Sequence, residues 1–130
     1  MEIDVTHMVE DEDQMPQLSG SIAELGNNAG KLTWQNSVAY GQAHPLLKTD
    51  EDREAARKHF RGYGAWSDED IAAWSEDELQ GIVCQDVAAA IREREAYGTD
   101  EDFVAACESG HASGRLSRSD DGRWFFYLGD

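Results

Sequence analysis

The chain has 130 residues, 40% of them hydrophobic, and is long enough to bury a core without disulfides or metals. Its formal net charge is −16 and its pI is near 4.4. This charge argues against direct binding to nucleic acid or to an anionic membrane, since like charges repel. We therefore expect a basic protein or nucleoprotein complex as partner, and no cofactor.

The predicted compartment is the cytoplasm. Two cysteines, Cys84 and Cys107, are too few for a disulfide framework and fit a reducing environment. The first residues lack the basic and apolar regions of a secretion signal, and no apolar run is long enough to span a membrane.

The region 1–18 is predicted to hold a strand followed by an acidic loop. Ile3 and Val5 alternate with polar residues, which indicates a short edge strand within residues 1–9. Residues 10–16 then form a charged loop that ends at Pro16. Its acids, Glu10, Asp11, Glu12 and Asp13, have no helix cap to explain them, although solvated acidic loops are common.

The region 19–109 is predicted to be a helical body. A first helix begins near Ser19 or Ser21 and is interrupted at residues 26–28 by Gly-Asn-Asn. A second covers about residues 29–43, with Leu32, Val38 and Ala39 near its inner face. It ends at His44, because a residue before proline avoids the helical conformation.

One pattern, Ser or Thr followed by three acids, occurs four times, at residues 49–52, 67–70, 75–78 and 99–102. The hydroxyl can accept a backbone N–H, the third acid can complete a capping box, and the acids face the positive end of the helix dipole. The four runs predict helices over about residues 49–61, 68–74, 76–97 and 99–108. Ala55, Ala56, His59 and Phe60 form the inner face of the first.

Two of these runs belong to a tandem repeat. Trp66 and Trp74 each precede a capping serine and are followed by Ile71 and Leu79, the arrangement of a hydrophobic staple. In the long helix a spacing of three and four residues predicts one buried stripe, formed by Leu79, Ile82, Val83, Val87, Ala90 and Ile91.

The region 113–129 is predicted to be a β-hairpin with an Asp-Gly turn at residues 121–122. A hairpin needs packing partners, which the helices and the N-terminal strand can supply. The predicted fold is one α+β domain over residues 1–130, mainly helical, with about five helices and a small antiparallel sheet.

Catalytic and metal signatures are weak, so we expect no enzyme. Cys107 and His111 lack a second pair of ligands, and Cys84 lies in a helix beside apolar residues. No phosphate loop, dinucleotide motif or nucleophile elbow is present. A small enzyme using Cys107, His111 or His59 is kept as the second alternative.

Capping explains the position of the acids better than their number. A capping box uses only the third acid, so two of the three acids in each run are surplus. The functional alternative to capping is a nucleic-acid mimic that blocks a nucleic-acid-binding protein, which would require several acidic elements side by side.

Residues 23–30 and 33–36, together with Gly-Ala-Trp-Ser at residues 64–67, resemble a signature of mobile-element proteins. The chain resembles small acidic accessory proteins of phages and plasmids, a class that includes anti-CRISPR and anti-restriction inhibitors. The resemblance implies an inhibitor but assigns no site residue.

We therefore predict a non-enzymatic intracellular inhibitor or adaptor with acidic binding surfaces. The predicted partner-binding residues are Asp68, Glu69, Asp70, Glu76, Asp77 and Glu78, with Glu10, Asp11, Glu12 and Asp13 as a mobile accessory arm, and Trp66 and Trp74 beside them. The first alternative is a helical interaction module with an aromatic contact surface at Trp66, Trp74 or the strand at residues 124–127.

Overall fold

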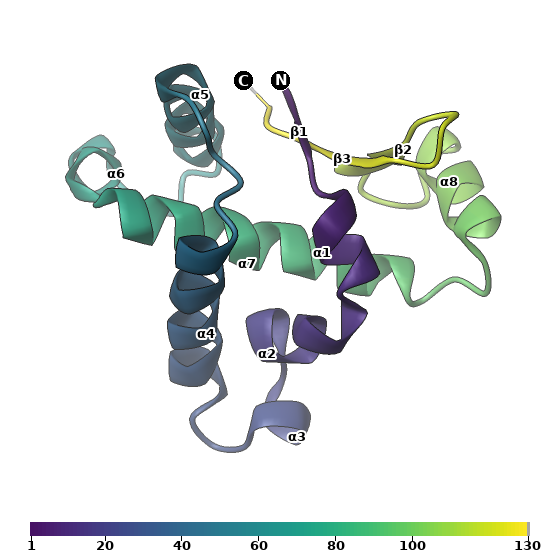
Figure 1. The fold of residues 1–130 in the computed structure, drawn as a ribbon, viewed down its shortest axis with the longest axis horizontal. Coiled ribbons are helices and arrows are strands. Elements are labelled where there is room, and N and C mark those ends of the chain that lie inside the picture. Colours follow the sequence, from purple (N-terminus) through teal and green to yellow (C-terminus); the bar gives the residue numbers. More distant parts are fainter. Residues whose placement is uncertain (130) are drawn as a thin grey trace.

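One long helix, α7, runs through the middle of the structure, and the other elements pack around it (Figure 1). The computed structural model describes residues 1–129, without the side chains of Glu12 and Glu24. The fold is α+β and mainly helical with a small antiparallel sheet, as predicted. In chain order the elements are β1 (Glu2–Asp4), α1 (Thr6–Glu10), η1 (Glu12–Gln14), α2 (Met15–Ser19), α3 (Ile22–Leu25), α4 (Ala29–Ala43), α5 (Asp50–Arg61), α6 (Asp68–Ala73), α7 (Glu76–Arg94), α8 (Asp100–Glu108), β2 (Leu116–Arg118) and β3 (Trp124–Tyr127).

The predicted helix starts are confirmed at all four acidic runs. The hydroxyls of Thr49, Ser67, Ser75 and Thr99 each accept the backbone N–H three residues later, at 3.1 to 3.2 Å. The capping boxes of α5 and α7 are complete, because Asp52 and Glu78 accept the N–H of the capping residue in return.

Helix α7 buries residues around most of its circumference, since α2 and α4 pack on it as well as the sheet. The predicted single stripe is therefore too narrow. Gln80, Gly81, Cys84 and Ala88 are buried in addition, whereas Ile82 is only half-buried. The helix also ends at Arg94, three residues before the predicted end.

The prediction of a loop at residues 10–16 is wrong. Residues 12–14 form the 3-10 helix η1, and α2 follows directly, with Pro16 in its first turn, where a missing N–H costs little. The predicted N-terminal strand is likewise confined to β1, because the chain turns into α1 at Thr6. Burial of Met8, Met15 and Leu18 against the body stabilises these short helices.

The predicted inner face of α4 is also wrong. Leu32 and Ala39 are exposed and Val38 is half-buried, while Thr33, Ser37, Tyr40 and Gly41 are buried. Ser37 can lie inside because its hydroxyl donates to the backbone oxygens of Thr33, at 2.7 Å, and Leu18, at 3.2 Å.

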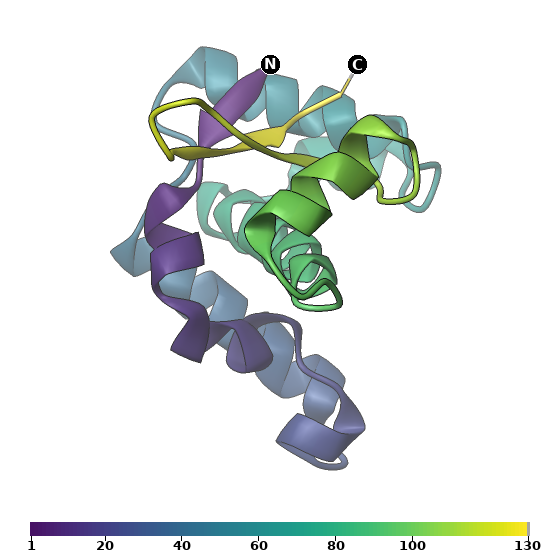
Figure 2. The same ribbon diagram turned by 90° about the vertical axis from the view of Figure 1, so that its right-hand side faces the viewer.

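The sheet joins the two ends of the described chain. Strand β3 pairs with the predicted hairpin partner β2 and, on its other edge, with β1, and all pairs are antiparallel. Phe126 opposes both Ile3 and Leu116 and points into the core. Helix α8 lies beside the sheet (Figure 2).

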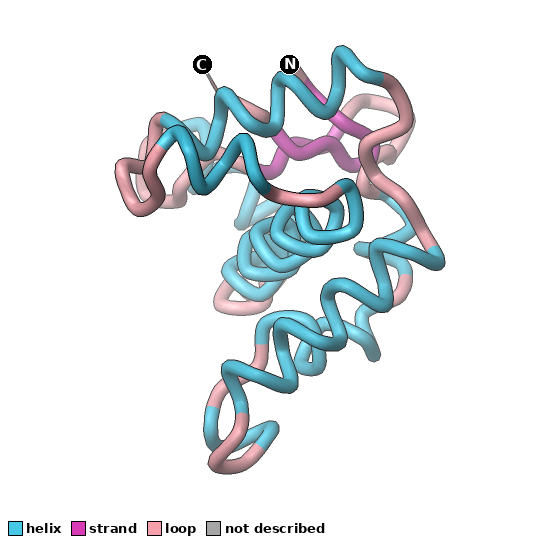
Figure 3. Tube along the Cα trace, turned by 90° about the vertical axis from the view of Figure 1, so that its left-hand side faces the viewer, coloured by secondary structure: helices cyan, strands magenta, loops and turns pink. Residues whose placement is uncertain are grey.

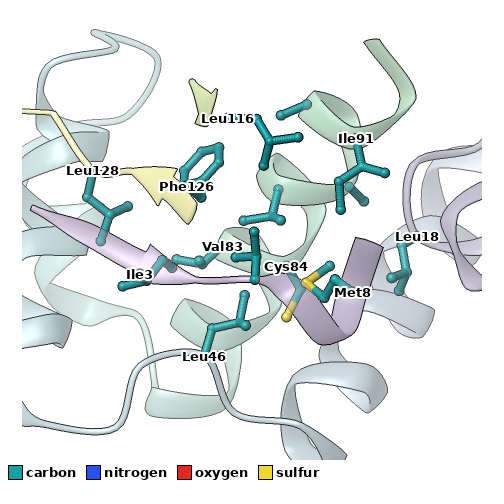
Figure 4. Close-up of a cluster of buried hydrophobic side chains, with 14 of the residues drawn as sticks. Ile3, Met8, Leu18, Leu46, Val83, Cys84, Ile91, Leu116, Phe126 and Leu128 are labelled. Carbon is teal, nitrogen blue, oxygen red and sulfur yellow. The ribbon is translucent and has the colours of Figure 1, made fainter. Parts of the chain in front are cut away.

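One cluster of buried side chains connects the sheet, the N-terminal segment and α7 (Figure 4). Phe126, Leu116 and Leu128 approach it from the sheet side, Val83 and Cys84 from α7, and Met8 from α1. Among the described residues no helix combines the length and the apolar character that crossing a membrane would require.

Candidate functional site

Three of the four acidic runs lie on helices at the same end of the molecule. We call this surface the acidic end and define it as residues 50–52, 68–70 and 76–78, the first turns of α5, α6 and α7. Figure 1 places α5, α6 and the start of α7 together on the left, whereas α8, which carries the fourth run, lies at the opposite end. Seen from that side, α5 and α6 lie in front of the end of α7 (Figure 3).

Arg53 fixes the first turns of α5 and α7 relative to each other. Its guanidinium donates to Asp50, at 2.9 Å, and to Glu76, at 2.7 Å. Nearby, the Gln42 amide donates to Asp77 at 3.1 Å. Because these contacts link α4, α5 and α7, the carboxylates of this end are presented by a fixed arrangement of helices.

The α6 run is the least neutralised part of the acidic end. Asp68, Glu69 and Asp70 are all exposed, and in the described part of the chain their carboxylates have no hydrogen bond or ion pair. The carboxylates of Asp52 and Glu78, by contrast, are engaged in capping boxes.

The fourth run is paired internally. Arg94 donates to Asp100 at 2.8 Å, and Arg118 donates to Glu101 at 3.1 Å. These four runs are nearly identical in sequence, and they differ in how many of their carboxylates pair with an arginine. The predicted binding residues 68–70 and 76–78 lie on helices at the same end of the molecule, where Arg53 pairs with Glu76 and the α6 carboxylates have no partner among the described residues.

The predicted accessory arm lies elsewhere. Glu10 ends α1, Asp11 follows it, and Asp13 is in η1, so this run belongs to a helical segment. Figure 1 shows that segment in front of the middle of α7 and apart from the acidic end. The side chain of Glu12 lies outside the described part of the structure.

Trp66 and Trp74 hold the helices of the acidic end together. Their rings meet edge to face at 5.4 Å, and each lies 5.8 Å from the ring of Phe60 on α5. Both tryptophans are half-buried, and their predicted staple partners Ile71 and Leu79 are fully buried. Most of each indole therefore serves packing.

The strand at residues 124–127 exposes less aromatic surface than an interaction module with an aromatic contact surface requires. Trp124 and Phe126 are buried, Phe125 is half-buried, and only Tyr127 is exposed.

A polar network behind the acidic end was not predicted. Asp86 accepts hydrogen bonds from Tyr63, at 2.8 Å, and Arg115, at 2.8 Å, and lies 3.2 Å from His59 Nε2. His59 Nδ1 accepts the Gly129 N–H at 2.9 Å, so Nε2 carries the ring proton and donates to Asp86. Burial, followed by the Asp86 contact, raises the pKa of Tyr63 to about 12.

This network ties α5, α7, the residue before β2 and the C-terminal segment together. Arg115 balances the charge of Asp86, and the His59 ring nitrogens are both engaged, so the arrangement is that of a structural cluster. Beside it lies a cavity of about 250 Å³ with walls from Phe60, Tyr63, Trp66 and Ile82. The sequence indicated His59 as an inner-face residue, but no local signal distinguished Asp86 from the other acids.

The candidate nucleophiles and metal ligands lack supporting groups. Burial raises the pKa of Cys84 to about 12, and it also raises the pKa of Cys107. His111 Nδ1 pairs with Ser109 Oγ at 2.7 Å. Among the described side chains, no three His, Cys, Asp or Glu residues converge in a way that could hold a metal ion.

Comparisons with protein-family models, with curated proteins and with solved structures found no match to this chain.

Proposed function

We propose that the protein is a non-enzymatic cytoplasmic inhibitor or adaptor that binds a basic, nucleic-acid-binding protein through the acidic end. The observation that carries this proposal is that three acidic runs, with nine carboxylates, lie on α5, α6 and α7 at the same end of the molecule. The α6 carboxylates have no partner within the described residues, so they are available to one outside the chain.

The geometry favours recognition of an extended basic surface. Along a single helix face, carboxylates would recur only about every 5 Å. Three separate helices can therefore present a wider patch with more carboxylates than one helix can. A groove that binds the closely spaced phosphates of nucleic acid has the complementary charge. We infer that the protein occupies such a groove in a defence or DNA-processing complex, as an inhibitor of the anti-CRISPR or anti-restriction type would.

The first experiment is affinity capture from a bacterial lysate, after nuclease treatment and at two salt concentrations, with mass spectrometry of the bound proteins. Electrostatic steering predicts fast association and an affinity that falls with salt. A partner held equally well at both salt concentrations, or lost on nuclease treatment, would contradict the mechanism.

The second experiment locates the surface. The triple variant Asp68→Lys, Glu69→Lys and Asp70→Lys should weaken binding of the captured protein at least tenfold. A control with the same change in net charge is Glu95→Lys, Glu108→Lys and Asp120→Lys, three exposed acids outside the acidic end. This control should change the affinity less than about threefold, since exposed charges are screened beyond about 8 Å at physiological salt. Equal losses in the two variants would show that net charge alone matters.

The cavity beside Trp66 favours a second candidate, an interaction module with an aromatic contact surface. Under that hypothesis a Trp66→Leu variant that keeps its fold abolishes binding, while the α6 charge reversals leave it unchanged. The two hypotheses therefore predict opposite outcomes for the same pair of variants.

A further inference from the structure

A second cavity, of about 380 Å³, lies between the N-terminal helices and α4, and it is lined mainly by polar side chains. It is formed where α2 packs beside α4 (Figure 1). Its floor includes Leu18 and Ala39, and its polar lining comes from Asp11, Gln14, Gln17, Asn36, Tyr40 and His44. Its volume is in the range of small ligand sites, which begin at about 300 Å³.

Tyr40 is the most informative residue of this cavity. Its side chain is only 9% exposed, and among the described residues its hydroxyl makes no hydrogen bond, but the hydroxyl is not enclosed and so opens to the cavity. The ring is held in place by His7, stacked at 6.3 Å, and by His44, at 4.9 Å. Burial raises the pKa of Tyr40 to about 12, so the hydroxyl stays protonated and can both donate and accept.

The neighbouring polar side chains also lack partners inside the molecule. Among the described side chains, those of Asp11, Gln14 and Gln17 make no hydrogen bond or ion pair. Asn36 donates its amide nitrogen to the backbone oxygen of Gln17 at 3.1 Å, which leaves its amide oxygen as an acceptor. The Asp11 carboxylate, the Tyr40 hydroxyl, the His44 ring and the amide groups of Gln14, Gln17 and Asn36 thus line the same space, and the amide oxygens among them are acceptors.

This set of groups matches a guanidinium. A guanidinium is planar and presents five N–H donors, and it pairs well with a carboxylate and with carbonyl-type oxygens. An anionic ligand would enter against a net charge of −16. An ammonium has only three donors and no plane, so it would satisfy fewer of these acceptors.

We propose that this cavity binds the guanidinium of an arginine side chain on the basic protein partner. The inference takes its partner from the proposed function, but none of the residues that line the cavity belongs to the acidic end. It gives the complex one specific anchoring residue in addition to the diffuse attraction between the charged surfaces.

The cavity can be tested without the partner, with N-acetyl-arginine amide as the probe. At about 150 mM salt, where exposed charges are screened beyond about 8 Å, the probe should shift the side-chain amide NMR signals of Gln14, Gln17 and Asn36 in a saturable way. N-acetyl-lysine amide should bind at least fivefold more weakly. Tyr40→Phe removes only the hydroxyl and should weaken arginine binding at least threefold, and Asp11→Asn at least tenfold. The charge-matched control Asp120→Asn, at an exposed turn residue, should leave it unchanged.

Several results would overturn this site. They are the absence of saturable shifts in the unmodified protein, equal binding of the arginine and lysine probes, and an unchanged affinity in Tyr40→Phe. Preferential binding of methyl glucoside would instead assign the cavity to a neutral hydroxyl-rich ligand and would also contradict the proposal.

The two proposals can fail separately. The α6 triple charge reversal should abolish capture of the partner but change the affinity for N-acetyl-arginine amide less than twofold. If the probe binds and capture is insensitive to that variant, the proposed function is wrong while the cavity assignment stands. If capture depends on α6 and the probe does not bind, only the cavity assignment is wrong.

Discussion

Ser75 begins the helix on which most of the structure packs. Its hydroxyl accepts the Glu78 N–H at 3.2 Å, and Glu78 accepts the Ser75 N–H at 3.3 Å. Ser75→Ala leaves a helix donor without its cap and should lower the free energy of unfolding by about 1 kcal/mol in urea denaturation. Ser117→Ala, at an exposed serine on β2, serves as the control and should stay within about 0.5 kcal/mol. Equal effects would mean that the cap contributes nothing.

Asp4, near the N-terminus, makes the stability of the fold depend on pH. Its carboxylate accepts from the Thr6 backbone, at 2.9 Å, the Thr6 hydroxyl, at 2.6 Å, and Arg123 Nε, at 2.8 Å. Partial burial alone would raise the pKa of Asp4, but the hydrogen bonds from Thr6 and Arg123 outweigh it and lower the pKa below 3.8. Ionised Asp4 therefore stabilises the fold above pH 3.8, and this contribution disappears as the pH falls through the lower, folded-state pKa.

The variant Asp4→Asn isolates that charge, because asparagine keeps an acceptor for Thr6. At pH 6 it should be less stable by about 0.5 kcal/mol, a small value because the pair is solvent-screened. Denaturation measured at a series of pH values should show the difference shrinking below pH 3.8. A difference that grows as the pH falls would contradict the assigned direction of the pKa shift.

Among the elements, α4 and α7 cross at a point where both carry glycine. A Cβ added to Gly81 would lie 2.8 Å from Cγ2 and 3.1 Å from Cα of Val38, and a Cβ on Gly41 would lie 3.0 Å from Cβ of Gln80. Gly81→Ala should therefore destabilise the protein by about 1–3 kcal/mol, as overpacking does, although alanine is the better helix former.

Gly30→Ala is the matched control for this crossing, since it lies in α4 and a Cβ there meets nothing within 4 Å. It should stabilise the protein by up to about 1 kcal/mol. Thermal and urea denaturation of both variants would show opposite signs. Two stabilised variants would mean that the helices are farther apart than the structure places them.

The elements that could be predicted from the sequence are those defined by local chemistry. Thr49, Ser67, Ser75 and Thr99 mark helix starts because the groups that a cap satisfies lie within three residues of it. The Asp-Gly turn defines the hairpin in the same way, and Gly122 has the positive φ, +86°, that such a turn uses.

The elements that could not be predicted depend on distant contacts. Helices α1 and α2 have no side-chain cap and form around Met8, Met15 and Leu18, which the body buries. The inner face of α4 carries Ser37, whose hydroxyl donates to a backbone oxygen of α2. The candidate site is similar: the sequence placed the acids on helix starts, but Arg53, Arg94 and Arg118 decide which runs are paired.

Over the whole molecule the charge is unevenly compensated. At the α8 end the guanidiniums of Arg94 and Arg118 pair with acids and also lie 5.4 and 5.8 Å from the ring of Trp124. At the acidic end Arg53 pairs with two carboxylates, and the three α6 carboxylates have no partner among the described residues. The repulsion in a chain of net charge −16 is therefore concentrated where the proposed partner would bind.

This uneven compensation predicts that salt stabilises the free protein. Raising NaCl from about 20 to about 500 mM shortens the screening length to a few ångströms and weakens repulsion among the acids. With like-charged helical neighbours costing about 0.2–0.5 kcal/mol each, the free energy of unfolding should rise by on the order of 1 kcal/mol. The exposed ion pairs that salt also weakens contribute little individually.

Neutralising the α6 run tests where that repulsion lies. A variant with Asp68→Asn, Glu69→Gln and Asp70→Asn should gain less from salt than the unmodified chain, because its repulsion is already reduced. The control, Glu95→Gln, Glu108→Gln and Asp120→Asn, removes the same charge from exposed sites outside the acidic end and should keep most of the salt effect. Urea denaturation at the two salt concentrations measures how the free energy of unfolding of each variant changes with salt. If the free energy of unfolding of the unmodified chain falls as salt is added, attractive ion pairs outweigh the repulsion. A basic partner would then relieve no repulsion at the acidic end.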